Sequence, residues 1–338
     1  MSKFSNAKIL NDIKDCRDIS EALLKTVKRL PDKIFINFEN KTMSFLEFNN
    51  LVNSCCNFFS KKKLKEKDIL SIKVKNSVEF LIIYFACIRF KLIINPIPSS
   101  ISDYEFLNKI KFLKSKIAFI DSSCKNKINV CMCINRDFNG DFCNFLVKNF
   151  SSDFNSNSNF NNKNIAVLYY SSGTTDDPKI IKYSYYSMLQ LQKSIIRSNF
   201  TKEDTNHLCV LPFGHTAVLR YSIKQAAILG STINIYENFW NIKNDFWRIV
   251  KNKQINFAQL VPTLVSSILS SSMNKLKTKN LFFGCGSAYL SKELQQNFEK
   301  KFNVRLFNYY GLSEIGASHF ENKYKRKIGS IGKPIDGY

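Results

Sequence analysis

The alternation of strand-like and helix-like segments is the feature that most constrains the fold of this chain. Apolar segments at 68–74, 92–98 and 116–121 have the composition of buried strands, and the segment 78–90 between the first two resembles a buried helix. Successive parallel strands need a crossover connection, which is usually a helix. The order therefore predicts an α/β protein with parallel-rich sheets and helices on their faces.

Serine residues mark two helix starts. Ser44 and Glu47 form the S-x-x-E pattern of a capping box, and apolar residues recur after them at helical spacing. Ser184 precedes a second segment with one apolar face. Further strands are expected at 165–170, 255–262, 281–286 and 304–311. The Ser/Asn-rich segment 151–164 has no core-forming pattern and is interpreted as a linker.

Composition limits the class of protein. The 338 residues are 44% hydrophobic, which is typical of a globular chain with a substantial core. We find no membrane-length apolar run and no apolar signal core, so a cytoplasmic location is expected. The ten cysteines are scattered without a C-x-x-C pattern, which favours reduced, mostly buried thiols over a zinc site.

The charge balance has three explanations. The chain has 50 Lys and Arg against 27 Asp and Glu, a net charge of +23. Such an excess is typical of nucleic-acid-binding proteins, and it would also attract small anionic ligands. The third explanation is that the excess of lysine is part of an overall bias in amino-acid composition, because the chain is rich in Lys, Asn, Ile and Phe. The lysines are spread along the whole length without a recognised nucleic-acid motif, so we do not expect nucleic acid to be the partner.

The segment YYSSGTTDDPK, residues 169–179, is the strongest candidate for a binding loop. It follows the apolar run 165–170 and is expected to lie between a strand and a helix, at the sheet edge where α/β proteins bind ligands. Its hydroxyl groups, glycine and lysine suit the oxygens of a polyphosphate. It is not the ordinary G-x-x-x-x-G-K-[ST] loop. The residues concerned are Ser171, Ser172, Gly173, Thr174, Thr175 and Lys179.

This loop resembles the phosphate loop of the adenylate-forming (AMP-binding) superfamily, which includes acyl-CoA synthetases, luciferases and nonribosomal peptide adenylation domains. Further segments are similar to family motifs in the same order, and an early T-M-S-F-L-E-F segment resembles the family's T-Y-x-E-L helix. The matching segments are LPFGHT at 211–216, GCGSAYLS at 284–291, NYYGLSEIG at 308–316 and GSIGKPIDG at 329–337. The resemblance implies the large N-terminal domain of these enzymes, with two parallel-rich sheets and a ligand crevice between subdomains at 70–198 and at 1–69 plus 199–338.

The resemblance also implies a role for each matching residue. The loop 171–179 would hold the β- and γ-phosphates of ATP, and Tyr310, or alternatively Tyr309, would stack on adenine. Ser313 would contact the α-phosphate and Glu314 would hold Mg²⁺. The remaining nucleotide-binding positions are Gly286, Ser287, Ala288 and Gly311. The positions expected to act in catalysis are Thr174, Lys179, Ser313 and Glu314.

The implied reaction joins a carboxylic acid to AMP with release of pyrophosphate. The acyl group would then pass to CoA or to a phosphopantetheine carrier protein. His215 is expected in the wall of the acyl pocket. Gly214 stands where amino-acid-activating relatives often have an aspartate, which favours a plain carboxylic acid over an α-amino acid.

Several departures from the family pattern put activity in doubt. Asp176 and Ile180 replace common glycines of the loop, and Ser287 and Tyr289 replace a glycine and a proline. The family's barrel subdomain, ribose-binding aspartate and C-terminal catalytic lysine have no counterpart before Tyr338. We therefore expect a fragment or truncated chain with low activity alone, completed by a separately encoded C-terminal domain if truncation is natural. The alternative function is a noncatalytic protein that binds a nucleotide or an acyl adenylate.

Overall fold

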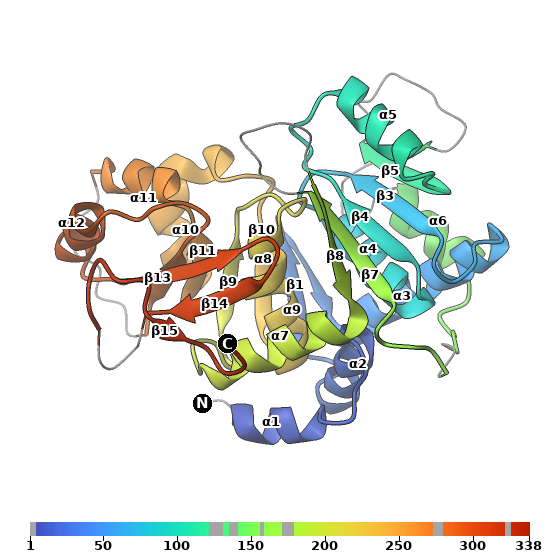
Figure 1. Ribbon diagram of the computed structural model, residues 1–338, viewed down its shortest axis with the longest axis horizontal. Helices are drawn as coiled ribbons and strands as arrows, with labels where there is room; N and C mark the ends of the chain where they lie inside the picture. The colour runs from blue at the N-terminus through green and yellow to red at the C-terminus, as the bar shows by residue number, and fades with distance from the viewer. Residues whose placement is uncertain are drawn as a thin grey trace.

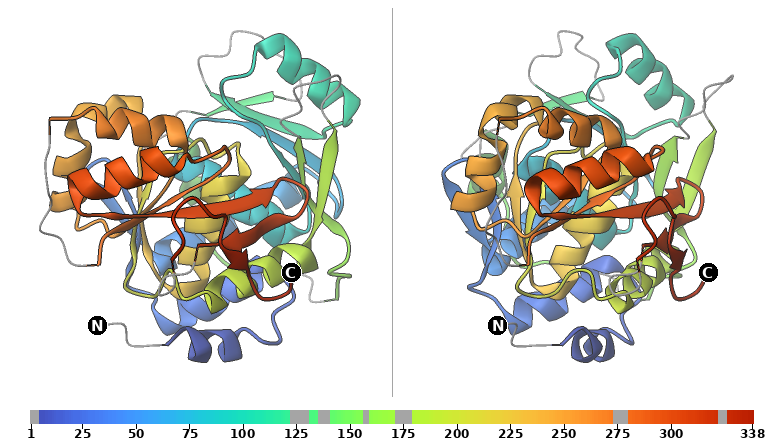
Figure 2. Two further views of the ribbon diagram at one scale, coloured as in Figure 1. Left: turned by 60° about the vertical axis from the view of Figure 1, so that its left-hand side comes forward. Right: turned by 90° about the vertical axis from the view of Figure 1, so that its left-hand side faces the viewer.

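The computed structural model describes residues 5–121, 131–134, 141–155, 159–170, 179–272, 280–321 and 326–338. These residues form an α/β structure with two mostly parallel sheets that are flanked by helices (Figures 1 and 2). The predicted fold class is therefore confirmed. Within the described ranges, every helix is too short or too polar to cross a lipid bilayer.

The smaller sheet has six strands in the order β6-β5-β3-β4-β7-β8. All neighbours are parallel except β7 and β8, which are antiparallel. The strands are β3 (Ile69–Lys73), β4 (Ile93–Pro96), β5 (Ile117–Asp121), β6 (Cys131–Ile134), β7 (Ile165–Tyr170) and β8 (Ile180–Ser184).

The larger sheet has nine strands in the order β15-β14-β13-β12-β11-β9-β10-β1-β2. Its centre is parallel, and antiparallel pairs occur at β1–β2, β13–β14 and β14–β15. The strands are β1 (Ile34–Phe38), β2 (Lys41–Ser44), β9 (Asn206–Cys209), β10 (Thr232–Ile235), β11 (Phe257–Leu260), β12 (Phe282–Cys285), β13 (Arg305–Leu312), β14 (Gly316–Phe320) and β15 (Lys333–Pro334).

Helices surround and separate the sheets. In Figure 1, α10, α11 and α12 lie beside the larger sheet and α5 and α6 beside the smaller one. The helices are α1 (Asn6–Asp12), α2 (Ile19–Arg29), α3 (Phe45–Lys61), α4 (Val78–Phe90), α5 (Asp103–Phe112), α6 (Asp141–Asn149), α7 (Tyr185–Arg197), α8 (Thr216–Val218), α9 (Lys224–Leu229), α10 (Phe246–Asn252), α11 (Pro262–Leu269) and α12 (Lys292–Phe302). A π-helical turn, η1 (Leu219–Ile223), joins α8 to α9, and a 3₁₀ turn, η2 (Trp240–Asp245), precedes α10.

Helix α4 is the central element of the core. Twelve of its 13 residues are buried, as expected for a helix that is apolar on all sides. The Phe80 ring packs against Phe213 in the segment after β9, with ring centroids 5.4 Å apart. The Tyr84 hydroxyl lies 3.5 Å from that of Tyr169 on β7. One helix therefore contacts segments that belong to both sheets.

The predicted helix starts are confirmed. The backbone N–H of Ser44 donates to Glu47 Oε2 at 2.6 Å and that of Glu47 donates to Ser44 Oγ at 3.2 Å, which completes the capping box. Ser184 caps α7, and α4 spans the predicted 78–90.

The predicted position of the binding loop was wrong in one respect. Residues 180–184 form strand β8, which pairs with β7 from Ile165↔Ser184 to Tyr170↔Ile180. The loop therefore joins two antiparallel strands, and the helix follows only after β8. The alternation of Ile181 and Tyr183 inward with Lys182 outward is the signal for a strand that the helical pattern of α7 obscured.

The described part of the Ser/Asn-rich segment packs against the domain. Asn57 of α3 donates to the carbonyl oxygens of Ser151 and Asp153 at 2.8 and 2.9 Å. The Phe154 ring stacks on Phe90, with centroids 5.8 Å apart. Isolated phenylalanines anchor this segment even though it lacks a periodic apolar pattern.

Asn76 connects the smaller sheet to segments of the larger sheet through hydrogen bonds. It is buried between β3 and α4. Its Nδ2 donates to the carbonyl oxygens of Leu211 and Tyr236 at 2.9 and 3.1 Å, and its Oδ1 accepts from the backbone N–H of Phe213 at 2.8 Å. A residue that follows strand β3 of the smaller sheet thus holds the two segments that follow β9 and β10 of the larger sheet.

We expect Asn76→Ala to lower the free energy of unfolding by about 3 kcal/mol, because three buried backbone groups lose their partner. Urea denaturation measures this change. Asn57→Ala is the matched control, since it removes two hydrogen bonds at the surface and should cost about 1 kcal/mol or less. Equal losses in the two variants would contradict the cross-linking role of Asn76.

Candidate functional site

The predicted phosphate loop is described only at its end. Lys179 is exposed and immediately precedes β8. The other candidate residues and the two acidic departures lie outside the described residues: Ser171, Ser172, Gly173, Thr174, Thr175, Asp176 and Asp177. The structure therefore fixes where the loop leaves and re-enters the sheet, at Tyr170 and Lys179.

One hydrogen bond joins the strand after this loop to the predicted catalytic turn. The Tyr183 hydroxyl on β8 donates to the carbonyl oxygen of Ser313 at 2.5 Å. Ser313 is half-buried and Glu314 is exposed, and both lie in the turn between β13 and β14. The Glu314 charge also contributes to a raised Tyr183 pKa, whose main cause is burial. The structure thus brings strand β8, which follows Lys179, against the turn that carries Ser313 and Glu314.

The predicted adenine segment follows β12 and depends on the small size of its glycine. A Cβ on Gly286 would lie 2.5 Å from the carbonyl oxygen of Tyr309 on the neighbouring β13. Ser287 has φ +67°, a left-handed conformation that suits glycine best. The side chains of Ser287 and Ala288 are exposed. The backbone at Gly286 is therefore in close contact with β13, while the side chains of Ser287 and Ala288 face solvent.

The two adjacent tyrosines of β13 face opposite environments. Tyr309 is buried and stacks on Phe320, with ring centroids 4.4 Å apart. Tyr310 is 40% exposed, and its ring meets that of His319 edge-on with 5.9 Å between the centroids. Successive residues of a strand point to opposite faces, so only one of the pair is able to stack on a ligand. In this structure that residue is Tyr310.

Glycine at 311 is required by the bulge in the β13–β14 pair. The register shifts between Tyr310 and Gly311. A Cβ on Gly311 would lie 2.0 Å from the carbonyl oxygen of Gly316. Only glycine allows β14 to approach this closely, and the turn that carries Ser313 and Glu314 begins from this contact.

The predicted acyl-pocket segment packs against the backbone that directly follows strand β4 of the smaller sheet. A Cβ on Gly214 would lie 2.5 Å from Pro98 Cα, so the aspartate of amino-acid-activating relatives has no room here. His215 is exposed at the start of α8, although the surrounding protein atoms reduce its hydration and lower its pKa. The described residues leave its role in the pocket a prediction.

Sequence reasoning did not identify two cations that lie close to this region. Arg220 and Lys224 are 6% and 4% exposed. They lie one turn apart, on η1 and at the start of α9. Burial, together with the smaller effect of the nearby Arg220 charge, lowers the pKa of Lys224 to about 7. The available signal was their i, i+4 spacing inside an otherwise apolar segment directly after LPFGHT.

In the described ranges, no three His, Cys, Asp or Glu side chains lie close enough together to hold a metal ion. Glu314 is a single exposed carboxylate in the candidate site. Mg²⁺ usually retains several waters and is shared between one or two carboxylates and substrate phosphates. The residues present therefore fit a magnesium ion that arrives with a nucleotide.

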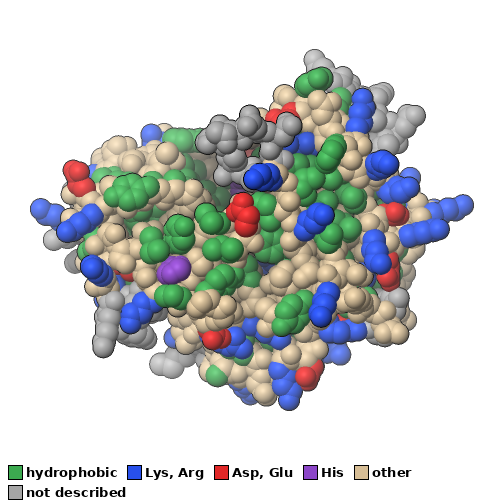
Figure 3. All heavy atoms as spheres, viewed as in Figure 1, with side chains coloured by type: hydrophobic (Ala, Val, Ile, Leu, Met, Phe, Trp, Pro, Cys, Tyr) green, Lys and Arg blue, Asp and Glu red, His purple; other side chains and the backbone are tan. Residues whose placement is uncertain are grey.

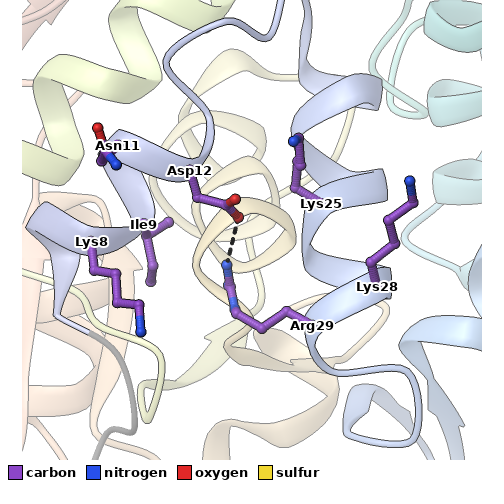
Figure 4. A pocket seen from close by; sticks show the side chains of 7 residues that line it. All are labelled: Lys8, Ile9, Asn11, Asp12, Lys25, Lys28 and Arg29. Atoms are coloured by element: carbon purple, nitrogen blue, oxygen red, sulfur yellow. Dashed lines mark ion pairs between the residues drawn. The ribbon is translucent and has the colours of Figure 1, made fainter.

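A basic cavity lies apart from these residues. It has a volume of about 440 Å³ between α1 and α2 (Figure 4). Its lining includes Lys8, Lys25, Lys28 and Arg29, with Arg29 Nη1 3.5 Å from Asp12 Oδ2. None of the candidate site residues lines it. On the face shown in Figure 3, Lys and Arg side chains are scattered and form no continuous stripe.

Comparison with known proteins gives a consistent result. The sequence model described as "AMP-binding enzyme" matches residues 23–338. Among curated proteins, marinolic acid–CoA ligase of Pseudoalteromonas sp. is 28% identical over 182 residues, which cover 50% of this chain and 28% of that protein. The 2-succinylbenzoate–CoA ligase of Bacillus pumilus is 23% identical over 320 residues, which cover 91% of this chain and 62% of that protein.

Solved structures share the fold. ATP-bound MatB from Rhodopseudomonas palustris superposes with a TM-score of 0.88 at 19% identity, covering 95% of this chain and 65% of that one. The O-succinylbenzoate coenzyme A synthetase MenE from Bacillus subtilis, in complex with AMP, gives 0.81 at 20% identity, covering 93% of this chain and 64% of that one. The chain therefore spans less than two thirds of the length of these relatives.

We expect Gly286→Ala to lower the free energy of unfolding by about 2 kcal/mol, because the new Cβ would force β12 and β13 apart. Thermal unfolding measures the loss. Ser287→Ala is the control in the same segment, and its exposed side chain should change stability by about 0.5 kcal/mol or less. A Gly286→Ala protein as stable as the control would refute the close packing of this segment.

Proposed function

Because the chain belongs to the AMP-binding enzyme family, we propose that it binds ATP and a carboxylic acid and forms an acyl adenylate. The carboxylate oxygen attacks the α-phosphorus of ATP, and the bond from the α-phosphorus to the bridging oxygen breaks. Pyrophosphate leaves with the electron pair of that bond. The step balances without a proton transfer, so the site needs positioning and charge neutralisation more than acid–base groups.

The hydrogen bond from Tyr183 to Ser313 is the observation that supports this function most strongly. It holds the strand that follows the phosphate loop against the turn that carries Ser313 and Glu314. A nucleotide with its phosphates near Lys179 and its α-phosphate near Ser313 would span this junction. Its base would lie between the open backbone of 286–288 and the exposed face of Tyr310.

Charge neutralisation would come from two sources. Lys179 would contact the β- and γ-phosphates, together with the hydroxyl groups of 171–175. Glu314 would hold Mg²⁺, which neutralises phosphate charge when it is bound. Each of these groups stabilises the pyrophosphate as it leaves.

We further propose that the acyl group passes to a thiol, on CoA or on the phosphopantetheine of a carrier protein. The names of the curated relatives are those of CoA ligases. The chain spans less than two thirds of these relatives, so residues outside the matched part would contribute to this second step. The acyl pocket would be lined by the segment around His215.

Carboxylate-dependent exchange of labelled pyrophosphate into ATP tests the proposal, with the full-length gene product and a broad panel of acids. Exchange in the presence of at least one acid is the expected result. ATP and AMP binding without exchange for any acid would instead identify a noncatalytic binding protein.

Lys179→Ala should weaken ATP binding roughly 10-fold and AMP binding little, because the lysine contacts phosphates that AMP lacks. Isothermal titration calorimetry with both nucleotides measures this difference. Lys182→Ala is the matched control, since Lys182 is exposed on the same strand and should change neither affinity. Equal weakening of ATP and AMP by Lys179→Ala would argue against its phosphate role.

A further inference from the structure

Arg220 and Lys224 are buried basic side chains that have no counter-ion among the described residues. Neither forms an ion pair with any Asp or Glu of the described ranges. In the described ranges, the Arg220 side chain donates from Nη2 to the Tyr183 hydroxyl at a long 3.4 Å and also interacts with the Tyr221 hydroxyl. A guanidinium has five N–H donors. Much of this donor capacity has no acceptor among the described residues.

The two cations respond differently to burial. Transfer of a charge from water into a protein interior is strongly unfavourable unless an opposite charge and hydrogen bonds replace the water. Lys224 is able to release its proton, and burial lowers its pKa to about 7. A guanidinium, by contrast, keeps its charge at any ordinary pH. The described residues supply no anion for Arg220, which leaves its charge available to an anionic ligand.

The position of Arg220 links it to the candidate site. Tyr183 accepts from Arg220 and donates to the carbonyl oxygen of Ser313, so one tyrosine side chain separates the cation from the catalytic turn. Arg220 also lies in the π-helical turn η1, five residues after His215. Such turns widen a helix locally and occur frequently at functional sites.

The surroundings of Arg220 are suited to a polar group. Its charge acts on the hydroxyls of Tyr169, Tyr183 and Tyr221, and each has a pKa that burial raises and Arg220 partly lowers again. The Tyr84 hydroxyl lies 3.5 Å from that of Tyr169. Neutral hydroxyls are donors for a carboxylate, so the tyrosines and the guanidinium together offer polar partners that a plain alkyl chain would not use.

We propose that the acid activated at this site carries a second anionic group, and that Arg220 binds this group in the acyl pocket with Lys224 adding positive charge behind it. The substrate class is a short dicarboxylic acid. This inference rests on the proposed function and narrows the plain carboxylic acid expected from the sequence. One carboxylate lies near Ser313 and reacts, while the other reaches past Tyr183 to Arg220.

The basic cavity between α1 and α2 is a weaker site for such an anion. Its Arg29 already pairs with Asp12, and Lys25 and Lys28 belong to the surface helix α2. Their charges remain in contact with water and need no ligand. Lys28 therefore provides a matched control cation whose removal should not affect the acid.

Paired acids that differ only at the far end test the proposal. The pairs are malonate with propanoate, succinate with butanoate, glutarate with pentanoate, and adipate with hexanoate. Pyrophosphate exchange by the full-length gene product should show kcat/KM roughly 100-fold higher for the diacid in at least one pair. A monoacid leaves the buried Arg220 charge without an anionic ligand, which is the source of the difference.

Arg220→Met separates anion recognition from a structural role. Replacement of an unpaired buried cation by an apolar side chain of similar length should keep or raise thermal stability. Diacid kcat/KM should fall roughly 100-fold while that of the matched monoacid is unchanged or rises. Arg220→Lys should recover part of the diacid activity, and Lys28→Gln should leave both acids unaffected.

Proton uptake gives a second readout, which depends on Lys224. Without ligand, its lowered pKa leaves Lys224 mostly neutral at about pH 8. An anion bound beside it favours the charged form and raises that pKa, so diacid binding should take up a proton from the buffer. Calorimetry of succinate binding in the presence of ATP, in buffers of different ionisation enthalpy, measures this uptake. Lys224→Met should abolish it, and butanoate should not produce it.

The outcomes distinguish failure of this inference from failure of the proposed function. If none of the acids supports pyrophosphate exchange, both this inference and the proposed function are overturned. Exchange that is as fast with monoacids as with diacids would overturn the second anionic group alone. A stable Arg220→Met protein that loses mono- and diacid activity equally would also overturn it, because Arg220 would then serve the reacting carboxylate or the phosphates.

Discussion

The burial of helix α4 is the constraint on which the rest of the structure depends. A helix that is apolar on all sides is stable only if other elements cover every face. Phe80 and Tyr84 reach segments that belong to different sheets, so the two sheets are held around one helix. Asn76 then fixes the connections that leave the larger sheet at the N-terminal end of α4. The relative position of the sheets follows from this packing.

The candidate site lies where these two sheets meet and inherits its geometry from them. Lys179 directly precedes β8 of the smaller sheet, and Ser313 and Glu314 lie in the turn between β13 and β14 of the larger one. Loops alone would not hold groups that are so far apart in the sequence in fixed relative positions. The Tyr183–Ser313 hydrogen bond fixes β8 against the β13–β14 turn, although 130 residues separate the two partners. Close backbone approaches at Gly286 and Gly311 fix the segments beside this turn in the larger sheet. Rigid strands therefore position the polar groups.

The sequence was sufficient for features that depend on local pattern. The helix 78–90 is an uninterrupted apolar run after a serine cap, and the capping box at Ser44 is a short-range signal. Strand β8 was missed because five residues are too few to separate its alternation from the helix that follows. Tyr183 and Arg220 were missed for a different reason. Neither belongs to a family motif, and their importance appears only when β8, η1 and the β13–β14 turn are placed together.

The unpaired charge of Arg220 also explains how such a site would discriminate between acids. The chain bears the cost of burying the cation whether or not a ligand is present, so that cost does not favour one acid over another. An acid with a distal carboxylate removes the imbalance when it binds, and an acid that ends in a methyl group leaves it in place. Specificity is a difference of affinities, and here the difference arises in the bound states, because only the acid with a distal carboxylate gives Arg220 a counter-ion. A buried cation that would be a defect in the fold alone thus becomes a basis for substrate selection.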